Sequence, residues 1–143
     1  GSVKCWGETP KPEGGLNPVG TPAHIIDAPY LEVGEEFVQV SVGIIGGDFA
    51  CARTSFGKIH CFSSSYVWPQ SGPETGRSAL PPSPGELTPI DMSQVGDAKF
   101  IDLACGDSKT VAVTEFGDLV HFGTRSTFSS TLIAKKAGLP AGW

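Results

Sequence analysis

Apolar residues alternate with polar or small ones in residues 37–42 and 100–104, which is the period of a half-buried β-strand. Each stretch is followed by two short segments rich in β-branched and aromatic residues, with a Phe-Gly step between them. The pattern predicts a strand followed by a β-hairpin, twice in the chain. The hairpin segments are 49–54 with 58–62, and 110–115 with 118–122.

The glycines of the two Phe-Gly steps predict the form of the hairpin turns. Gly57 and Gly117 stand where a three-residue hairpin loop ends in a left-handed residue that forms a bulge. Glycine alone takes that conformation without a steric cost from Cβ.

The chain also repeats itself with an offset of about 60 residues. A Thr-Pro step opens a short apolar stretch in each copy, and we expect residues 23–26 and 90–92 to complete four strands per unit. A helical turn is expected only at 130–137, before Gly138 and Pro140. The predicted organisation is the end of a preceding blade (1–7), a first full repeat (21–63), a Pro/Ser/Gly-rich insertion (64–87), a second full repeat (88–123), and a tail or the start of another unit (124–143).

Repeated units of four short antiparallel strands predict an all-β fold, with about two β-propeller blades and part of a third. Composition agrees: 19 Gly and 12 Pro in 143 residues disfavour a helical bundle, and 39% hydrophobic residues disfavour a disordered chain. An incomplete propeller leaves open sheet faces. We therefore expect a protein partner or other blades to cover them, from the same parent chain, a cleaved partner or self-association.

Three segments resemble the regulator of chromosome condensation repeat family. They are Gly-Gly-Asp-Phe-Ala-Cys-Ala at 46–52, Phe-Gly-Lys-Ile-His-Cys-Phe at 56–62 and Val-Lys-Cys-Trp-Gly at 3–7. The cysteine-bearing form is similar to repeats in the ectodomains of crinkly-type plant receptor kinases. The chain departs from the pattern at 121–123, where His-Phe-Gly replaces Cys-Trp-Gly, and it lacks the Asn-x-x-Gly-Gln-Leu-Gly segment that follows in the family. The resemblance implies a propeller, and either an interaction module or, as the alternative, a fragment of a guanine nucleotide exchange factor.

The hairpin register predicts a disulfide. With Gly57 as the bulge, Cys51 lies directly opposite Cys61, within reach of a disulfide bond. The second unit has Val111 and His121 at these positions, so both cysteines are missing together. The competing interpretation is two buried free thiols. A disulfide indicates an extracellular or secretory-pathway location.

By the same register Cys5 is the second cysteine of its unit, so its partner is expected ten residues upstream, before the first residue of the chain. Cys105 has no partner by register. Either the chain begins in the middle of a blade, or Cys5 forms a second disulfide with Cys105, or the two cysteines bond to other chains. A structural zinc site is disfavoured because no Cys-x-x-Cys or His-x-x-x-His spacing occurs.

The insertion supplies candidate partner-binding residues: Tyr66 and Trp68 as exposed aromatics, and Arg77 before a proline-rich stretch. The competing interpretation is that the aromatics cover their own blade. A net charge of −5 disfavours nucleic-acid binding, and no apolar run is long enough for membrane insertion. Catalytic motifs are lacking, and no cofactor is expected. The sequence therefore favours a non-enzymatic interaction or structural module of a larger extracellular protein or assembly.

Overall fold

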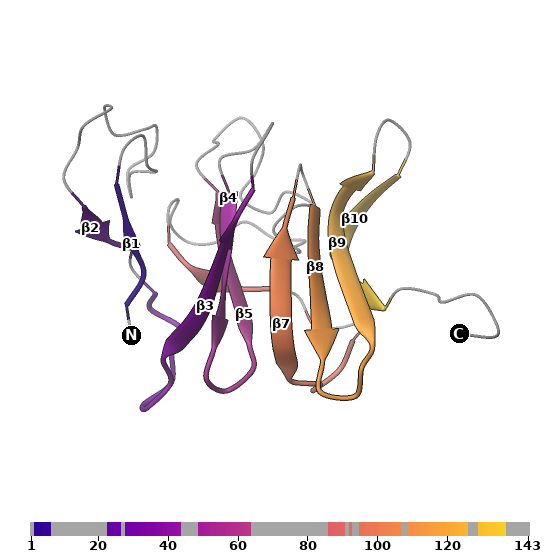
Figure 1. The fold of residues 1–143 in the computed structure, drawn as a ribbon, viewed down its shortest axis with the longest axis horizontal. Coiled ribbons are helices and arrows are strands. Elements are labelled where there is room, and N and C mark those ends of the chain that lie inside the picture. Colours follow the sequence, from indigo (N-terminus) through magenta and orange to yellow (C-terminus); the bar gives the residue numbers. More distant parts are fainter. Residues whose placement is uncertain are drawn as a thin grey trace.

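The computed structural model describes residues 2–6, 23–26, 28–43, 49–63, 86–90, 92, 95–106, 109–125 and 129–136. In these segments the chain forms antiparallel β-sheets and no helix, and hence no helix that could cross a membrane. Three sheets stand side by side in chain order (Figure 1). We call them the N-terminal pair (β1 Lys4–Cys5, β2 His24–Ile25), the first blade (β3 Phe37–Val42, β4 Phe49–Thr54, β5 Ile59–Ser63, β6 Thr88–Pro89) and the second blade (β7 Phe100–Cys105, β8 Lys109–Thr114, β9 Leu119–Arg125, β10 Ser129–Lys136).

Each blade is a four-stranded antiparallel sheet whose strands follow one another in chain order. The predicted all-β architecture of four-stranded blades is confirmed. β3 and β7 share an irregular register, since each contains a bulge between its first and third residues.

The two hairpin turns are built alike. Gly57 and Gly117 have φ values of 79° and 83°, as the Phe-Gly steps predicted. Their amides donate to the carbonyls of Thr54 and Thr114 at 3.0 and 2.9 Å. The hydroxyls of the same threonines accept from the amides of Lys58 and Asp118, both at 3.1 Å. The threonine thus closes the turn from inside the sheet.

The grouping of strands differs from the one that we expected. The repeat bounds predict that the strand after each Thr-Pro step joins the strands that follow it, but β2 pairs with β1, and β6 pairs with β5. β6 also begins at Thr88 rather than at Ile90. The short strand therefore completes the outer edge of the preceding sheet. Sequence repetition fixes the period of the unit but not the point at which one sheet ends.

The expected helical turn at 130–137 is also wrong. β10 spans Ser129–Lys136 and pairs with β9, with a register shift between Thr131 and Lys135. Backbone pairing along β9 supplies hydrogen bonds that a single helical turn cannot match. β10 thus provides the fourth strand of the second blade.

The hydrophobic core lies between neighbouring sheets and forms two clusters. The first fills the space between the two blades, where the largest buried side chains are Phe49, Phe100 and Phe122. The second lies between the N-terminal pair and the first blade, where Val3 and Ile26 meet Ala50, Ala52 and Phe62. The two faces of β4 thus contribute to different clusters, because alternate side chains of a strand point to opposite faces.

Candidate functional site

A disulfide joins the middle strands of the first blade. Cys51 and Cys61 are register partners on β4 and β5, their Cα atoms are 4.1 Å apart, and both are fully buried. This confirms the predicted pair. Val111 and His121 are register partners at the equivalent positions of β8 and β9, as expected, and both are exposed. The disulfide therefore lies on the face of the first blade that packs against the second.

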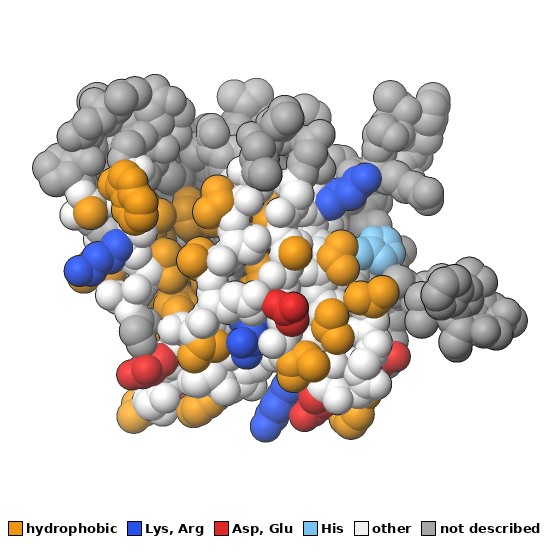
Figure 2. Space-filling view, viewed as in Figure 1, with side chains coloured by type: hydrophobic (Ala, Val, Ile, Leu, Met, Phe, Trp, Pro, Cys, Tyr) orange, Lys and Arg blue, Asp and Glu red, His pale blue; other side chains and the backbone are white. Residues whose placement is uncertain are grey.

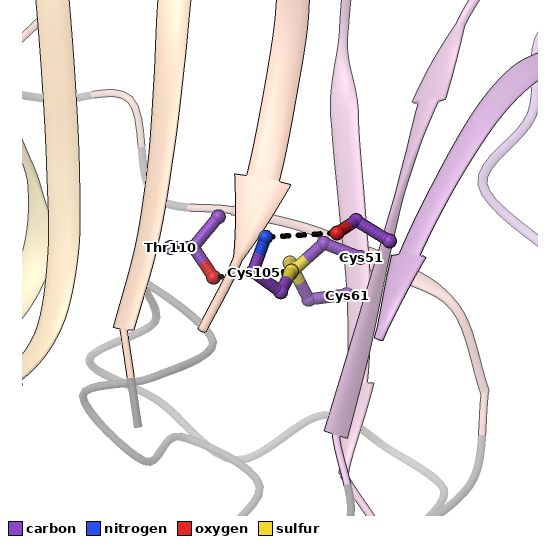
Figure 3. Close-up of a disulfide and its surroundings, with 5 residues drawn as sticks. Cys51, Cys61, Cys105 and Thr110 are labelled. Carbon is purple, nitrogen blue, oxygen red and sulfur yellow. Dashed lines mark hydrogen bonds between the residues drawn. A yellow bond between two sulfur atoms is a disulfide. The ribbon is translucent and has the colours of Figure 1, made fainter. Parts of the chain in front are cut away.

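Cys105 lies beside this disulfide, at the end of β7 (Figure 3). Its amide donates to Ser41 Oγ at 2.8 Å, and its sulfur is 3.5 Å from Thr110 Oγ1. The same hydroxyl is 3.7 Å from Cys51 Sγ. Burial raises the pKa of the Cys105 thiol, and hydrogen bonds from Thr110, Ser41 and the Cys51 backbone only partly oppose this effect. Cys105 is thus a free, protonated thiol in the contact between the blades.

Polar side chains fasten β3 to β7. The Gln39 side-chain amide donates to Asp102 Oδ1 at 2.6 Å and to the Leu103 carbonyl at 3.1 Å. Arg53 Nε donates to Gln39 Oε1 at 2.9 Å, which fixes the orientation of the amide. The hydrogen bond from Gln39, followed by that from the Leu103 amide, lowers the pKa of Asp102. Sequence reasoning missed Gln39 and Ser41, and their alternation with valines along β3 is the only signal that could have revealed them.

A second polar contact supports the hairpin turn of the first blade. The buried carboxylate of Glu35 accepts from Thr54 Oγ1 at 2.6 Å and from the Glu32 amide at 3.0 Å. Lys58 Nζ lies 4.0 Å from Glu35 and forms an ion pair with Glu32. Burial raises the pKa of Glu35, but these hydrogen bonds and the charge of Lys58 outweigh it, so the net pKa is lowered. Glu35 therefore remains ionised and holds the turn in place.

An apolar groove of about 550 Å³ separates β1 from β3. One wall consists of residues 2–6, which include Cys5 and the exposed Trp6. The other wall is the face of β3 that carries Val38, Val40 and Val42. Hydrophobic side chains line this hollow in the space-filling view (Figure 2). We call it the β1–β3 groove.

The β1–β3 groove corresponds to a position that is filled elsewhere in the molecule. Val40 pairs with β4 at the position where Leu103 pairs with β8, and Val42 corresponds to Cys105 in the same way. Leu103 is 5% exposed and Cys105 is partly buried, because β3 and β4 cover them. Val40 and Val42 are 55% and 61% exposed. The same face of a blade is thus covered at one junction and open at the other.

The structure does not bring the remaining sequence-predicted residues together. Tyr66, Trp68 and Arg77 lie outside the described residues. Cys5 and Cys105 are both free thiols, so the structure does not pair them with each other. Cys5 packs against the second cluster, beneath the β1–β3 groove, whereas Cys105 packs against the first. Within the described segments no group of three His, Cys, Asp or Glu residues is placed to hold a metal ion.

Comparisons with known proteins define the fold. No protein-family model matches the chain, and no curated protein matches it. Among solved structures, 24 chains match. One is human WBSCR16, a β-propeller protein similar to the regulator of chromosome condensation, with a TM-score of 0.55 and 12% identity over 88% of this chain. The chain spans 30% of the length of that structure. At this identity the likeness shows the propeller-type fold.

Proposed function

We propose that the chain is a non-enzymatic interaction or structural module built from propeller repeats of the chromosome-condensation-regulator type, and that it works as part of a larger extracellular protein or assembly. Its partners are other propeller blades, which cover the open blade face. The observation that carries this proposal is the β1–β3 groove, where Val40 and Val42 are equivalent to Leu103 and Cys105, residues of the second blade that the first blade covers.

The energetics favour coverage of this wall. Val38, Val40 and Val42 are each more than half exposed on one strand, and Trp6 is 74% exposed across the groove. Burial of a Val or Leu side chain contributes about 1.5–3 kcal/mol relative to its exposure. A contiguous apolar face of this kind is typical of an interface.

The disulfide supports the proposed location. Cys51–Cys61 is fully buried between the two blades. Disulfides persist mainly in extracellular and secretory compartments. The Cys51–Cys61 bond also supports a structural role for the chain, because it stiffens the hairpin against which the second blade packs.

The proposal can be tested by completing the sheet that the N-terminal pair begins. In an extended chain, residues 37–57 are repeated directly before Ser2, and the added copy of Cys51 is replaced by Ser. The added hairpin should occupy the β1–β3 groove and raise the melting temperature by about 4 °C or more.

A matched pair of variants locates the effect. In the extended chain, Val40→Glu in the original β3, not in the added copy, should abolish the increase in melting temperature, because a carboxylate would be buried without a partner. Ile101→Glu should not, since Ile101 is as exposed as Val40 (54% against 55%) but lies outside the groove. An extension that leaves the melting temperature unchanged, or one that Val40→Glu does not affect, contradicts the proposal.

A further inference from the structure

The N-terminal pair, β1 and β2, has the same backbone pairing as β5 and β6 of the first blade. β1 and β2 have the same register as β5 and β6, and each pair is followed by the same backbone bond one residue further along. Cys5 pairs with His24 as Cys61 pairs with Thr88, and Lys4 pairs with Ile25 as His60 pairs with Pro89. The Ile26 amide then donates to the Val3 carbonyl at 3.0 Å, as the Ile90 amide donates to the Ile59 carbonyl at 3.1 Å.

This correspondence makes Cys5 the counterpart of Cys61. On its other edge β5 pairs with β4, where Cys51 stands opposite Cys61 and bonds to it. In the described part of the chain, no strand pairs with the matching edge of β1. The β1–β3 groove opens at that edge, and both Cys5 and Phe62 line it.

The surroundings of Cys5 also match those of a cysteine in a blade. It is half-buried against the second cluster, and burial raises the pKa of its thiol. The thiol is therefore largely protonated at neutral pH and reacts slowly with small reagents. A neighbouring strand that holds a second cysteine next to Cys5 would place the two sulfur atoms close enough to form a disulfide despite this low reactivity.

We propose that the free edge of β1 pairs with a β-hairpin of another propeller blade, and that a cysteine on the adjacent strand of this hairpin forms a disulfide with Cys5. This inference rests on the proposed function, because the hairpin is the occupant of the β1–β3 groove. The partner strand places its cysteine as β4 places Cys51, with small side chains like Ala50 and Ala52 on the opposite face.

The bond forms by oxidation of two thiols. Glutathione disulfide accepts the two electrons and is reduced to two glutathione molecules, which take up the two protons released by the cysteines. The thiolate of one cysteine first attacks glutathione disulfide, which forms a mixed disulfide and releases one glutathione. The other cysteine then attacks the mixed disulfide and releases the second glutathione.

The test uses the extended chain with the added copy of Cys51 retained. The turn residues 55–57 of the added copy lead into Ser2, as they lead into Lys58 in the first blade. After equilibration in glutathione buffer at pH 8, peptide mapping without reductant should find Cys5 bonded to the added cysteine, beside an unchanged Cys51–Cys61 bond. Alkylation of Cys5 should be slower than in the 143-residue chain by about tenfold or more.

The control moves the added cysteine to the next position, in the added copy of Ala52. Successive side chains of a strand point to opposite faces, so this cysteine should leave Cys5 as a free thiol. Cys105 serves as an internal reference and should form no disulfide in either the chain with the retained cysteine or the chain with the displaced cysteine.

Three outcomes overturn the inference: Cys5 stays free beside the retained cysteine, the displaced cysteine bonds to it equally well, or Cys5 joins a second copy of the chain instead. The stability of the serine form of the extended chain tests the proposed function separately. If the serine form of the extended chain gains stability but the cysteine form leaves Cys5 free, the groove is a docking site for a blade without a covalent link. If neither effect appears, both proposals fall.

Discussion

Val40 and Leu103 hold the same register position on β3 and β7, but Leu103 is 5% exposed and Val40 is 55% exposed. Leu103 is covered because the first blade packs over it, and its carbonyl accepts a hydrogen bond from Gln39. No described residue covers Val40 in the same way, although it faces an apolar groove. The same register position is therefore buried at one junction of the molecule and largely exposed at the other.

This pair gives the first prediction. Leu103→Ala should lower the free energy of unfolding by about 2–4 kcal/mol, because it leaves a cavity between the blades. Val40→Ala should change it by less than about 0.5 kcal/mol, since the side chain is largely in water. Urea denaturation of the two variants measures both values. Equal losses would show that Val40 is already buried in solution, against the arrangement described here.

The two turn glycines allow a second matched comparison. Gly57 and Gly117 have nearly the same positive φ, so alanine should cost about 1–2 kcal/mol at each position. A Cβ on Gly57 would also come within 2.7 Å of Lys99 Cβ and 3.1 Å of Lys99 Cα, whereas a Cβ on Gly117 meets nothing within 4 Å. The Gly57 carbonyl also accepts from the Phe100 amide at 2.8 Å.

Gly57→Ala should therefore be the more destabilising variant by about 1 kcal/mol or more. Thermal unfolding of both variants provides the measurement. If Gly117→Ala were equally destabilising, the hairpin turn of the first blade would not be in contact with the second blade.

The disulfide gives a third prediction. The double variant Cys51→Ala, Cys61→Ala should lose about 2–4 kcal/mol of stability, through loss of the cross-link and of buried side-chain volume. A reducing agent should lower the melting temperature of the unaltered chain but not that of the variant. Cys5→Ser serves as the control and should keep the sensitivity to reduction. An unaltered chain that reductant does not affect would contradict a stabilising disulfide.

Much of this architecture could be predicted from the sequence because it depends on local chemistry. Glycine at 57 and 117 determines the hairpin turns, and the turns in turn place Cys51 opposite Cys61. The assignment of strands to sheets could not be predicted, since β2 and β6 are two residues long and carry too little pattern to choose between neighbours. The contacts of Gln39 with β7 join residues 63 and 64 positions apart, and the β1–β3 groove lies between residues 2–6 and β3. No local pattern encodes packing between segments so far apart in the chain.

Glu35 gives a prediction for the dependence of stability on pH. Its pKa is lowered in the folded chain, so its contribution is fully present above the pKa of the unfolded state. That contribution is lost as the pH falls through the lower, folded pKa. Between pH 7 and pH 3 the unaltered chain should lose more stability than Glu35→Gln does. A Glu35→Gln profile parallel to that of the unaltered chain would show that this carboxylate does not stabilise the turn.

The central claim is that the open wall of the β1–β3 groove is a blade face made to be covered by another blade. A crystal structure of the extended chain, with residues 37–57 repeated before Ser2, tests it most directly through the exposure of Val40. The account predicts that the added hairpin pairs with β1 and that the exposure of Val40 falls from 55% to a buried value, as at Leu103. A structure in which the added residues pack elsewhere and Val40 remains in water would contradict it.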